Sequence, residues 1–294
     1  MRMMIVTGGT GGHIYPALAL ADAAKQRYGE QAQIAFVGND DRMEASLIPE
    51  KGYPFYPLHT SGLVGGVRGK VKAVAQMLAA YRKAKGYIHS FRPDIVIGFG
   101  GYVSAPLILA AHHLGVVTMI HEQNSIVGKA NQLVMKQVDA IVCCYERCLS
   151  QLDAQKTRLL GNPRASVAAR AAFDEAYFRS LGLDPKRRTI LVVMGSLGSS
   201  SVNDLMKEAL PQVKEDCQIL YVCGRNNPMD PSAFQGHPHI HVVDYVEQLA
   251  ILSHIDLIVC RAGATTLAEI TALGVPAILV PSPYVAHNHQ FYNA

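Results

Sequence analysis

A short apolar run that breaks into glycines opens this chain and restricts its fold more than any other segment. Residues 3–6 read MMIV, residues 7–13 read TGGTGGH, and an alanine-rich helical pattern begins near Tyr15. Strand, glycine loop and helix in this order direct backbone N–H groups and the positive end of a helix dipole at an anion, usually a phosphate. The sequence therefore predicts a phosphate-handling α/β protein, with a merely tight strand-to-helix turn as the alternative.

Two common nucleotide-binding motifs do not fit this loop. No Lys-Ser/Thr pair follows the glycines, as a P-loop requires, and there is no clean GxGxxG followed by an acid about twenty residues later. His13 stands at the start of the helix instead, and its imidazole can change charge near neutral pH.

Strand-like and helical segments alternate along the whole chain. Because the strand-like segments are rich in Val and Ile without alternation, we expect parallel sheets covered on both faces. The turn Gly161–Arg164 separates two such series, so we predict an α/β protein of two Rossmann-like, doubly wound domains, 1–162 and 163–294. The predicted strands are 3–7, 33–37, 95–98, 116–120, 140–144, 157–160, 189–193, 218–223, 240–243, 257–260 and 277–280. The predicted helices are 15–28, 71–90, 104–114, 128–136, 200–210, 246–254 and 265–273.

Composition supports a globular protein with two cores. The 294 residues are 49% hydrophobic and 17% charged, which excludes a disordered chain. The net charge of +4 gives no argument for nucleic acid. No apolar run approaches the roughly 18 residues of a membrane-spanning helix. The six cysteines form no CxxC pair, so we expect reduced thiols of a cytosolic protein rather than metal ligands.

Polar and glycine-rich loops follow five of the predicted strands. Ligands of open parallel sheets bind beyond the carboxyl ends of the strands, so these loops mark the binding face of each domain. Helix capping explains single residues such as Ser104, but not four consecutive polar residues at 121–124. The loops are 8–13, 98–102, 121–125, 195–199 and 261–266.

Motifs spread over the full length resemble one family. The segments GGTGGHIYPALALA, IGFGGYVSAP, HEQNSIVGKAN, GNPR, RAGATTLAEITALGVPAILVPSPY and NHQFYNA occur in this order. They are similar to segments of the MurG-type N-acetylglucosaminyltransferases of peptidoglycan synthesis, in glycosyltransferase family 28. The resemblance implies the two-domain GT-B fold and inverting transfer of N-acetylglucosamine from UDP-N-acetylglucosamine. The implied acceptor is the C4 hydroxyl of undecaprenyl-diphosphate-linked muramoyl-pentapeptide, so that lipid I becomes lipid II.

The resemblance also implies a donor site, mainly on the second domain. Ser196 and the run 264–266 would hold the diphosphate at helix starts, and Glu269 would bind the ribose. Val246 would pack on the uracil, and Gln290 would hold sugar hydroxyls. The residues implied for UDP-N-acetylglucosamine are Thr10, Gly11, Gly12, Asn124, Arg164, Ser196, Val246, Arg261, Ala264, Thr265, Thr266, Glu269, His289 and Gln290.

The acceptor hydroxyl needs a base, and two residues qualify. His13 is the first choice, because an imidazole accepts a proton at neutral pH. Glu122 is the second, with acceptance of N–H groups in its own loop as the structural alternative. Tyr102 would position the acceptor, and His121 reads as a hydrogen-bonded core group rather than a base. The residues implied for the acceptor are Thr10, His13, Tyr102, His121 and Asn131.

No metal or other cofactor is expected at this site. Helix N-termini and fixed N–H groups can stabilise a departing diphosphate without a cation. No Asp-x-Asp motif ends a strand, and Asp40-Asp41 is interpreted as a surface turn.

Two departures from the family pattern concern loop 194–199 and the C-terminus. The family loop GGSxGA reads MGSLGS at 194–199, so one glycine and the alanine are replaced. Family members continue past the NA of NHQFYNA, so we expect a C-terminally shortened chain that exposes apolar surface.

A basic segment without acids indicates a membrane-facing surface. Residues 51–93 contain no Asp or Glu, and such a one-signed, partly apolar surface suits an anionic bilayer. The alternative is a solvated helix whose apolar stripe is core. We expect a peripheral protein on the cytoplasmic face of the bacterial membrane, with other cell-wall synthesis proteins as partners and no nucleic acid. The residues concerned are Lys51, Arg68, Lys70, Lys72, Arg82, Lys83, Lys85 and Arg92, beside Leu63, Val64, Val67, Val71, Val74 and Leu78.

Two other functions stay open. The first is another nucleotide-sugar enzyme of this fold, either a glycolipid glycosyltransferase or a UDP-N-acetylglucosamine 2-epimerase. The scarcity of acids beyond Glu122 and Glu269, and the HEQN loop, favour transfer over epimerisation. The second is a non-catalytic nucleotide-sugar-binding protein, against which the joint presence of His13, Asn124, Arg261 and Glu269 argues.

Overall fold

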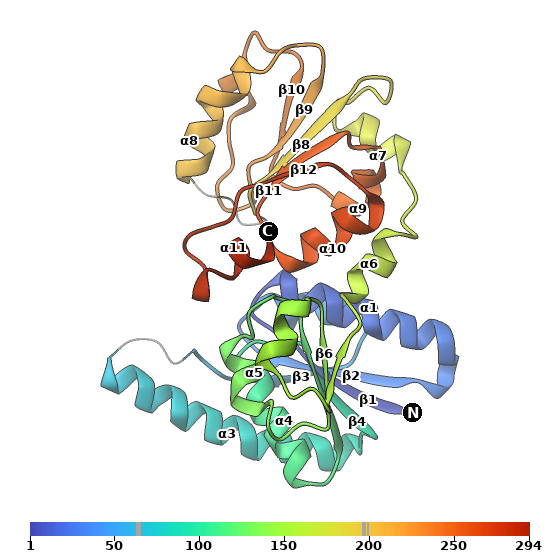
Figure 1. The fold of residues 1–294 in the computed structure, drawn as a ribbon, viewed down its shortest axis with the longest axis vertical. Coiled ribbons are helices and arrows are strands. Elements are labelled where there is room, and N and C mark those ends of the chain that lie inside the picture. Colours follow the sequence, from blue (N-terminus) through green and yellow to red (C-terminus); the bar gives the residue numbers. More distant parts are fainter. Residues whose placement is uncertain (63–65, 196–197, 199) are drawn as a thin grey trace. The chain divides into compact units, whose positions relative to one another are not determined.

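The chain divides into two compact units, each with its own parallel sheet. The computed structural model describes residues 1–62, 66–195, 198 and 200–294. The N-terminal unit is Met1–Arg164 and the C-terminal unit is Ala165–Ala294. Figure 1 shows the sheet and helices of each unit.

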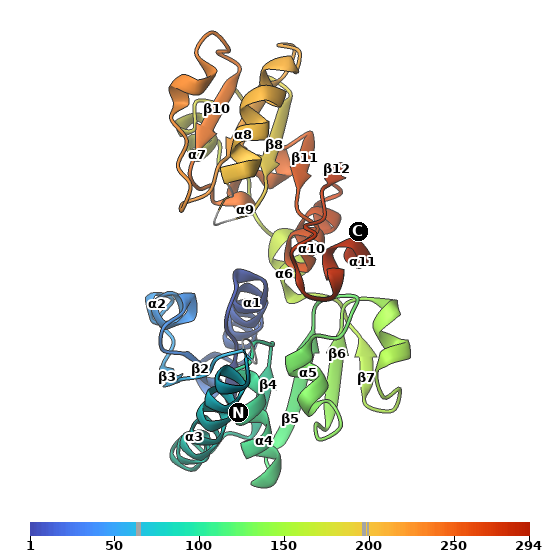
Figure 2. The same cartoon turned by 90° about the vertical axis from the view of Figure 1, so that its left-hand side faces the viewer.

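The N-terminal unit contains a seven-stranded sheet in the order β3-β2-β1-β4-β5-β6-β7. Every pairing in it is parallel, so all strands end at the same edge. Figure 2 shows these strands from a second side. The strands are β1 (Arg2–Val6), β2 (Gln33–Asn39), β3 (Phe55–Leu58), β4 (Ile95–Gly98), β5 (Val117–Glu122), β6 (Ala140–Cys143) and β7 (Thr157–Leu159).

Helices cover both faces of this sheet, which explains why its strands are apolar without alternation. Met3 and Ile5 of β1 pack in one core cluster with the first long helix, whereas Met4 and Val6 pack on the opposite face. On that opposite face α3 packs beside α4 (Figures 1 and 2). The helices are α1 (Gly11–Tyr28), α2 (Met43–Glu50), α3 (Val67–Phe91), α4 (Ser104–His113) and α5 (Lys129–Val134), with α6 (Pro163–Ala168) running into the C-terminal unit.

The C-terminal unit contains a five-stranded parallel sheet in the order β10-β9-β8-β11-β12. Leu191 of β8 faces one core cluster and Val192 faces the other, so this sheet is also covered on both faces. The strands are β8 (Thr189–Val193), β9 (Gln218–Val222), β10 (Ile240–Val243), β11 (Leu257–Cys260) and β12 (Ala277–Leu279). The helices are α7 (Glu175–Ser180), α8 (Ser200–Ala209), α9 (Gln248–Ile251), α10 (Ala264–Leu273) and α11 (His289–Asn293).

Two elements next to β2 were not predicted from the sequence. Helix α2 spans eight residues with Pro49 inside its last turn, so its apolar period is too short to recognise. Strand β3 contains Pro57, which lacks an N–H and is tolerated because β3 is an edge strand. Both elements position residues of the candidate site.

Two predicted boundaries were wrong in ways that matter for the site. Helix α1 begins at Gly11 rather than near Tyr15, so the second glycine pair and His13 form its first turn. Strand β5 continues to Glu122, so His121 and Glu122 are its last residues rather than loop residues.

The predicted alternative for the apolar stripe of α3 was also wrong. Val71, Val74 and Leu78 are 63%, 52% and 55% exposed, so they are not core residues. The buried face of α3 is formed by Ala73, Ala80, Ala84 and Ile88. Leu63 and Val64, predicted beside this stripe, lie outside the described residues. None of the described helices is long and apolar enough to cross a membrane.

Candidate functional site

Three loops of the N-terminal unit lie at the carboxyl ends of β1, β4 and β5, which are neighbours in the sheet. The first two loops interlock through glycine. A β-carbon on Gly101 would stand 2.7 Å from the carbonyl oxygen of Gly8, and one on Gly100 would stand 2.6 Å from Cδ2 of His13. Gly100 and Gly101 also have φ of +104° and +82°. Only glycine fits both positions, and the loop therefore packs closely against the His13 imidazole.

The His13 imidazole is oriented from two sides. Its Nδ1 lies 3.2 Å from Oγ1 of Thr10, the residue that precedes α1. Its other edge faces Gly100. The ring is half-buried, so neighbouring residues restrict it while part of it stays accessible to a substrate. Because α1 has no acidic residue in its first turn, the positive helix end beside His13 is not offset by a nearby carboxylate of that turn.

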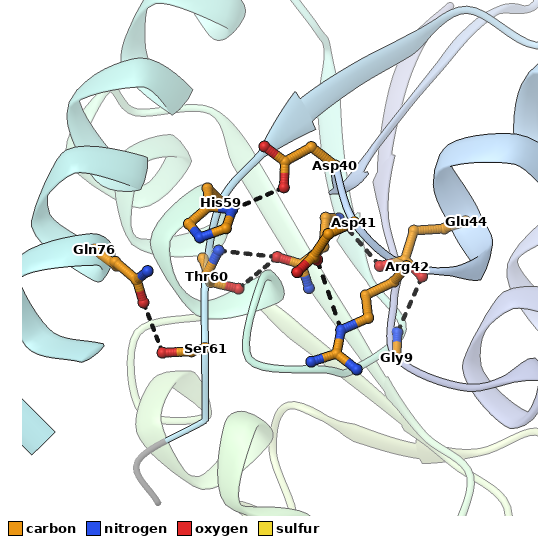
Figure 3. A network of polar contacts seen from close by, with 10 residues as sticks. Gly9, Asp40, Asp41, Arg42, Glu44, His59, Thr60, Ser61 and Gln76 are labelled. Atoms are coloured by element: carbon orange, nitrogen blue, oxygen red, sulfur yellow. Dashed lines mark hydrogen bonds and ion pairs between the residues drawn. The ribbon is translucent and has the colours of Figure 1, made fainter. Parts of the chain in front are cut away.

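A buried glutamate that the sequence analysis missed holds the glycine loop. Glu44 is fully buried, and its Oε2 accepts a hydrogen bond from Gly9 N at 3.2 Å while its Oε1 accepts one from Asn39 N at 3.1 Å. Asn39 in turn accepts two hydrogen bonds from Thr60. Figure 3 shows these contacts, which join the loop to α2 and to the end of β3.

Asp40 and Asp41 lie in an exposed turn, as predicted. Asp40 Oδ1 pairs with Nδ1 of His59 at 2.8 Å, and Asp41 lies 3.6 Å from the guanidinium of Arg42 (Figure 3). All of these side chains are exposed, whereas Glu44 and the adjacent Asn39 are buried.

The contacts of Glu122 favour its structural role over that of a base. The side chain is 2% exposed. Its Oε1 accepts from Asn124 N at 3.0 Å, and its Oε2 accepts from Gly128 N and Asn131 Nδ2, each at 2.8 Å. Burial raises the pKa of the Glu122 carboxyl, and these hydrogen bonds oppose the rise. The carboxylate therefore ties the end of β5 to the loop and to α5.

His121 and Asn131, both predicted near the acceptor, are buried beside Glu122. His121 is 2% exposed, and its Nε2 lies 3.2 Å from the carbonyl oxygen of Gly161. Burial lowers the pKa of His121, although its hydrogen bonds oppose this. Asn131 is 3% exposed and donates to Glu122 and to the carbonyl of His121. Both side chains thus support the loop. For His121 this agrees with its interpretation as a hydrogen-bonded core group.

The remaining predicted residues of this unit lie in the three loops or, for Arg164, beside α1. Tyr102 is partly exposed, and its ring lies beside Gly62. Asn124 is partly exposed directly after Gln123, which donates to the carbonyl of Phe99 at 3.3 Å. Arg164 is the last residue of the unit, and its guanidinium lies 5.3 Å from the ring centroid of Tyr15.

In the C-terminal unit, α10 is a second helix that begins just after the carboxyl end of a strand, here β11. Gly263 precedes the helix with extended backbone, and Ala264, Thr265 and Thr266 form a first turn without an acidic residue. Glu269 follows one turn later and is 6% exposed. Its Oε2 accepts a hydrogen bond from Nε2 of Gln248 in α9 at 3.2 Å, a contact between helices that no local sequence pattern predicts.

Other residues predicted for the donor are engaged within this unit. Val246 is 6% exposed in a core cluster, so its side chain is not an open platform for uracil. Arg261 donates to the carbonyl of Val280 at 3.1 Å, and Gln290 accepts from Ser282 N at 2.8 Å. His289 begins α11, next to Gln290. Ser196 lies outside the described residues.

Two parallel α/β units with polar loops at the carboxyl ends of their strands form a GT-B-like fold. The chain belongs to glycosyltransferase family 28. Residues 3–143 match the family's N-terminal domain, and residues 189–294 match its C-terminal domain.

Individual relatives agree with this family. The chain is 40% identical to the UDP-N-acetylglucosamine--N-acetylmuramyl-(pentapeptide) pyrophosphoryl-undecaprenol N-acetylglucosamine transferase of Halalkalibacterium halodurans, over 100% of this chain and 82% of the relative. It is 42% identical to the protein of the same name from Lactiplantibacillus plantarum, with the same coverage. The crystal structure of Acinetobacter baumannii MurG matches with a TM-score of 0.75 and 30% identity, over 99% of this chain and 81% of that one.

Proposed function

We propose that this chain transfers N-acetylglucosamine from UDP-N-acetylglucosamine to the C4 hydroxyl of undecaprenyl-diphosphate-linked N-acetylmuramoyl-pentapeptide. The family and the names of its relatives supply the donor and the acceptor. The observation that carries the chemistry is the placement of His13, which Thr10 and Gly100 hold at the positive end of α1.

The His13 imidazole serves as the general base. In the proposed step the acceptor oxygen forms a bond to C1 of the sugar while the bond from C1 to the UDP oxygen breaks, with inversion at C1. The hydroxyl proton moves to the imidazole, and UDP leaves with the electron pair of the broken bond. Tyr102, at the rim of the same loops, positions the acceptor.

The donor is held by the C-terminal unit. The first turn of α10 receives the diphosphate through backbone N–H groups, and Glu269 binds the ribose hydroxyls with its carboxylate steadied by Gln248. The departing diphosphate is stabilised by these fixed dipoles, so the reaction proceeds without a catalytic metal ion.

The acceptor is met at an anionic membrane surface through α3. Val67, Val71, Val74 and Leu78 recur at spacings of three and four residues, so they share one face, and all are more than half exposed. Basic residues flank them, and the first turn of α3 has no acid. An amphipathic face of this kind binds anionic lipid through apolar burial and charge attraction together. The exposed basic residues of α3 include Arg68, Lys70, Lys72, Arg82 and Lys83.

The test is a product assay with purified chain, labelled UDP-N-acetylglucosamine and the lipid-linked acceptor. We expect labelled lipid-linked disaccharide and UDP in equal amounts, with no loss of rate in EDTA. His13→Ala is expected to lower kcat by about 10²–10⁴-fold with donor affinity little changed, whereas His59→Ala, an exposed histidine of the same unit, retains the rate. A near-normal rate for His13→Ala would remove this residue as the base.

Epimerisation is the competing reaction on the same donor. Incubation with UDP-N-acetylglucosamine alone separates the two reactions, because an epimerase converts the sugar without acceptor. Formation of the 2-epimer in that incubation, with no lipid product when acceptor is added, would replace the proposed function.

A further inference from the structure

A second group of ligand-type side chains lies in the C-terminal unit, away from the loops described above. Glu215 stands three residues before β9, and His237 and His239 stand three residues and one residue before β10. Ile219 N donates to the carbonyl of His239 at 2.8 Å, which ties the two strand starts together. The group therefore sits at the amino ends of β9 and β10, whereas the predicted donor residues follow the carboxyl ends of β8 and β11.

The three side chains are close enough to share one ion. One ligand atom of each lies within 4.8 Å of those of the other two, and Nδ1 of His239 lies 3.9 Å from Oε1 of Glu215. The rings of His237 and His239 are 5.9 Å apart at an interplanar angle of 75°, so they are not stacked on each other. A nitrogen of each ring therefore already lies near the same point as the Glu215 carboxylate.

His239 supplies an independent sign that something is bound here. The residue is only 2% exposed, yet neither ring nitrogen has a hydrogen-bond partner among the described residues. A buried polar group without a partner is unfavourable, because it has lost water and gained nothing in return. A cation bound by one of these nitrogens would remove that penalty for the nitrogen that binds it.

We propose that Glu215, His237 and His239 bind a Zn²⁺ ion. Two imidazoles and one carboxylate suit Zn²⁺, which takes three protein ligands and a water in tetrahedral geometry. Bonds of about 2.0–2.2 Å place tetrahedral ligand atoms roughly 3.4 Å apart, so His239 and Glu215 must close by about 0.5 Å and the other pairs by at most about 1.4 Å. Glu215 is exposed and can make this movement, whereas His239 is fixed in the interior.

Hydrogen bonds from Arg187 hold the backbone next to Glu215 in place. Nη2 of Arg187 donates to the carbonyls of Glu215 and Cys217, at 2.8 and 3.2 Å. This holds the segment before β9 in place and directs that guanidinium nitrogen to backbone oxygens. The ion would fasten the edge strand β10 to β9, a stabilising role that is separate from sugar transfer.

The test is a Zn²⁺ titration of the full chain after removal of bound metal with a chelator, followed by calorimetry. We expect one Zn²⁺ per chain, and a weakening of at least about 10-fold in His237→Asn and in Glu215→Gln, since losing a ligand costs no less than losing its outer-shell support. Both substitutions are at solvent-accessible positions, so the variants are expected to fold. Zn²⁺ should also raise the Tm of the native chain and not that of the double variant.

A matched control distinguishes this site from other surface ligands. Asp40, Asp41 and His59 form a comparable group of three exposed residues in the N-terminal unit. His59→Asn should leave Zn²⁺ binding unchanged. If His59→Asn abolishes binding, or if His237→Asn and Glu215→Gln bind Zn²⁺ as tightly as the native chain, the proposal is wrong. The transfer assay is unaffected by that outcome, because His13 and α10 take no part in the zinc site.

Discussion

The imidazole of His13 lies so close to Gly100 that a β-carbon at position 100 would stand 2.6 Å from its Cδ2 and 2.8 Å from its Nε2. Gly100 belongs to the loop after β4, whereas His13 belongs to the first turn of α1. The orientation of the proposed base is therefore set by the loop after β4 as well as by α1 itself.

Gly100→Ala should lower kcat by about 10²-fold, because displacing a reacting group by about 1 Å is enough for such a loss. The new methyl group would push the imidazole from its place. Steady-state kinetics with donor and lipid acceptor measure the effect. Gly115→Ala is the matched control, since Gly115 also has positive φ (+70°) but open space around it. Equal kcat values for the two variants would show that the contact does not position His13.

Glu122→Gln should lower stability and activity together. In either orientation its amide nitrogen would face a donor, Asn124 N on one side or Gly128 N and Asn131 Nδ2 on the other, and hydrogen bonds to a charged carboxylate contribute about 1.5–3 kcal/mol each. Chemical denaturation gives the loss in unfolding free energy, and Glu50→Gln, on the surface of α2, serves as the comparison. A collapse of kcat with unchanged stability would instead identify Glu122 as the base.

The alternation of strands and helices could be predicted from the sequence because each buried strand carries a distinct apolar run. The ends of these apolar runs also located the loops at the carboxyl ends of the strands. It could not locate Glu44, whose carboxylate matters only because the fold brings Gly9 N and Asn39 N to it. In a charged segment such as NDDRME, a glutamate that will be buried looks like any other.

The engagement of predicted ligand residues was equally invisible to sequence reasoning. Arg261 reaches the carbonyl of Val280, and Gln290 accepts from Ser282 N, through contacts between segments about twenty and eight residues apart. For a related reason, the sequence did not decide whether Val71 and Leu78 are buried or exposed. A helical period identifies a face, but the neighbouring element decides whether that face is covered.

Lowering the pH should destabilise the native fold through His121. Burial lowers its pKa in the folded state, whereas the unfolded chain takes up the proton near pH 6.5. The contribution to stability is therefore complete above pH 6.5 and is lost as pH falls toward the folded-state pKa. Urea denaturation between pH 8 and 5 should show a smaller loss in His121→Gln than in the native chain or in His59→Asn. Parallel pH profiles for all three proteins would contradict this.

The exposed stripe of α3 should bind anionic vesicles. Each basic residue near such a surface contributes about 1 kcal/mol, so Lys70→Glu combined with Lys72→Glu should weaken binding by at least about 10-fold. Val71→Ser combined with Leu78→Ser should also weaken it, by removing apolar burial. Leu205→Ser, at a 63% exposed position on α8, is the matched control and should bind like the native chain. Sedimentation with phosphatidylglycerol vesicles measures all four proteins. Equal binding of the native chain to neutral phosphatidylcholine vesicles would rule out the charge attraction on which this proposal depends.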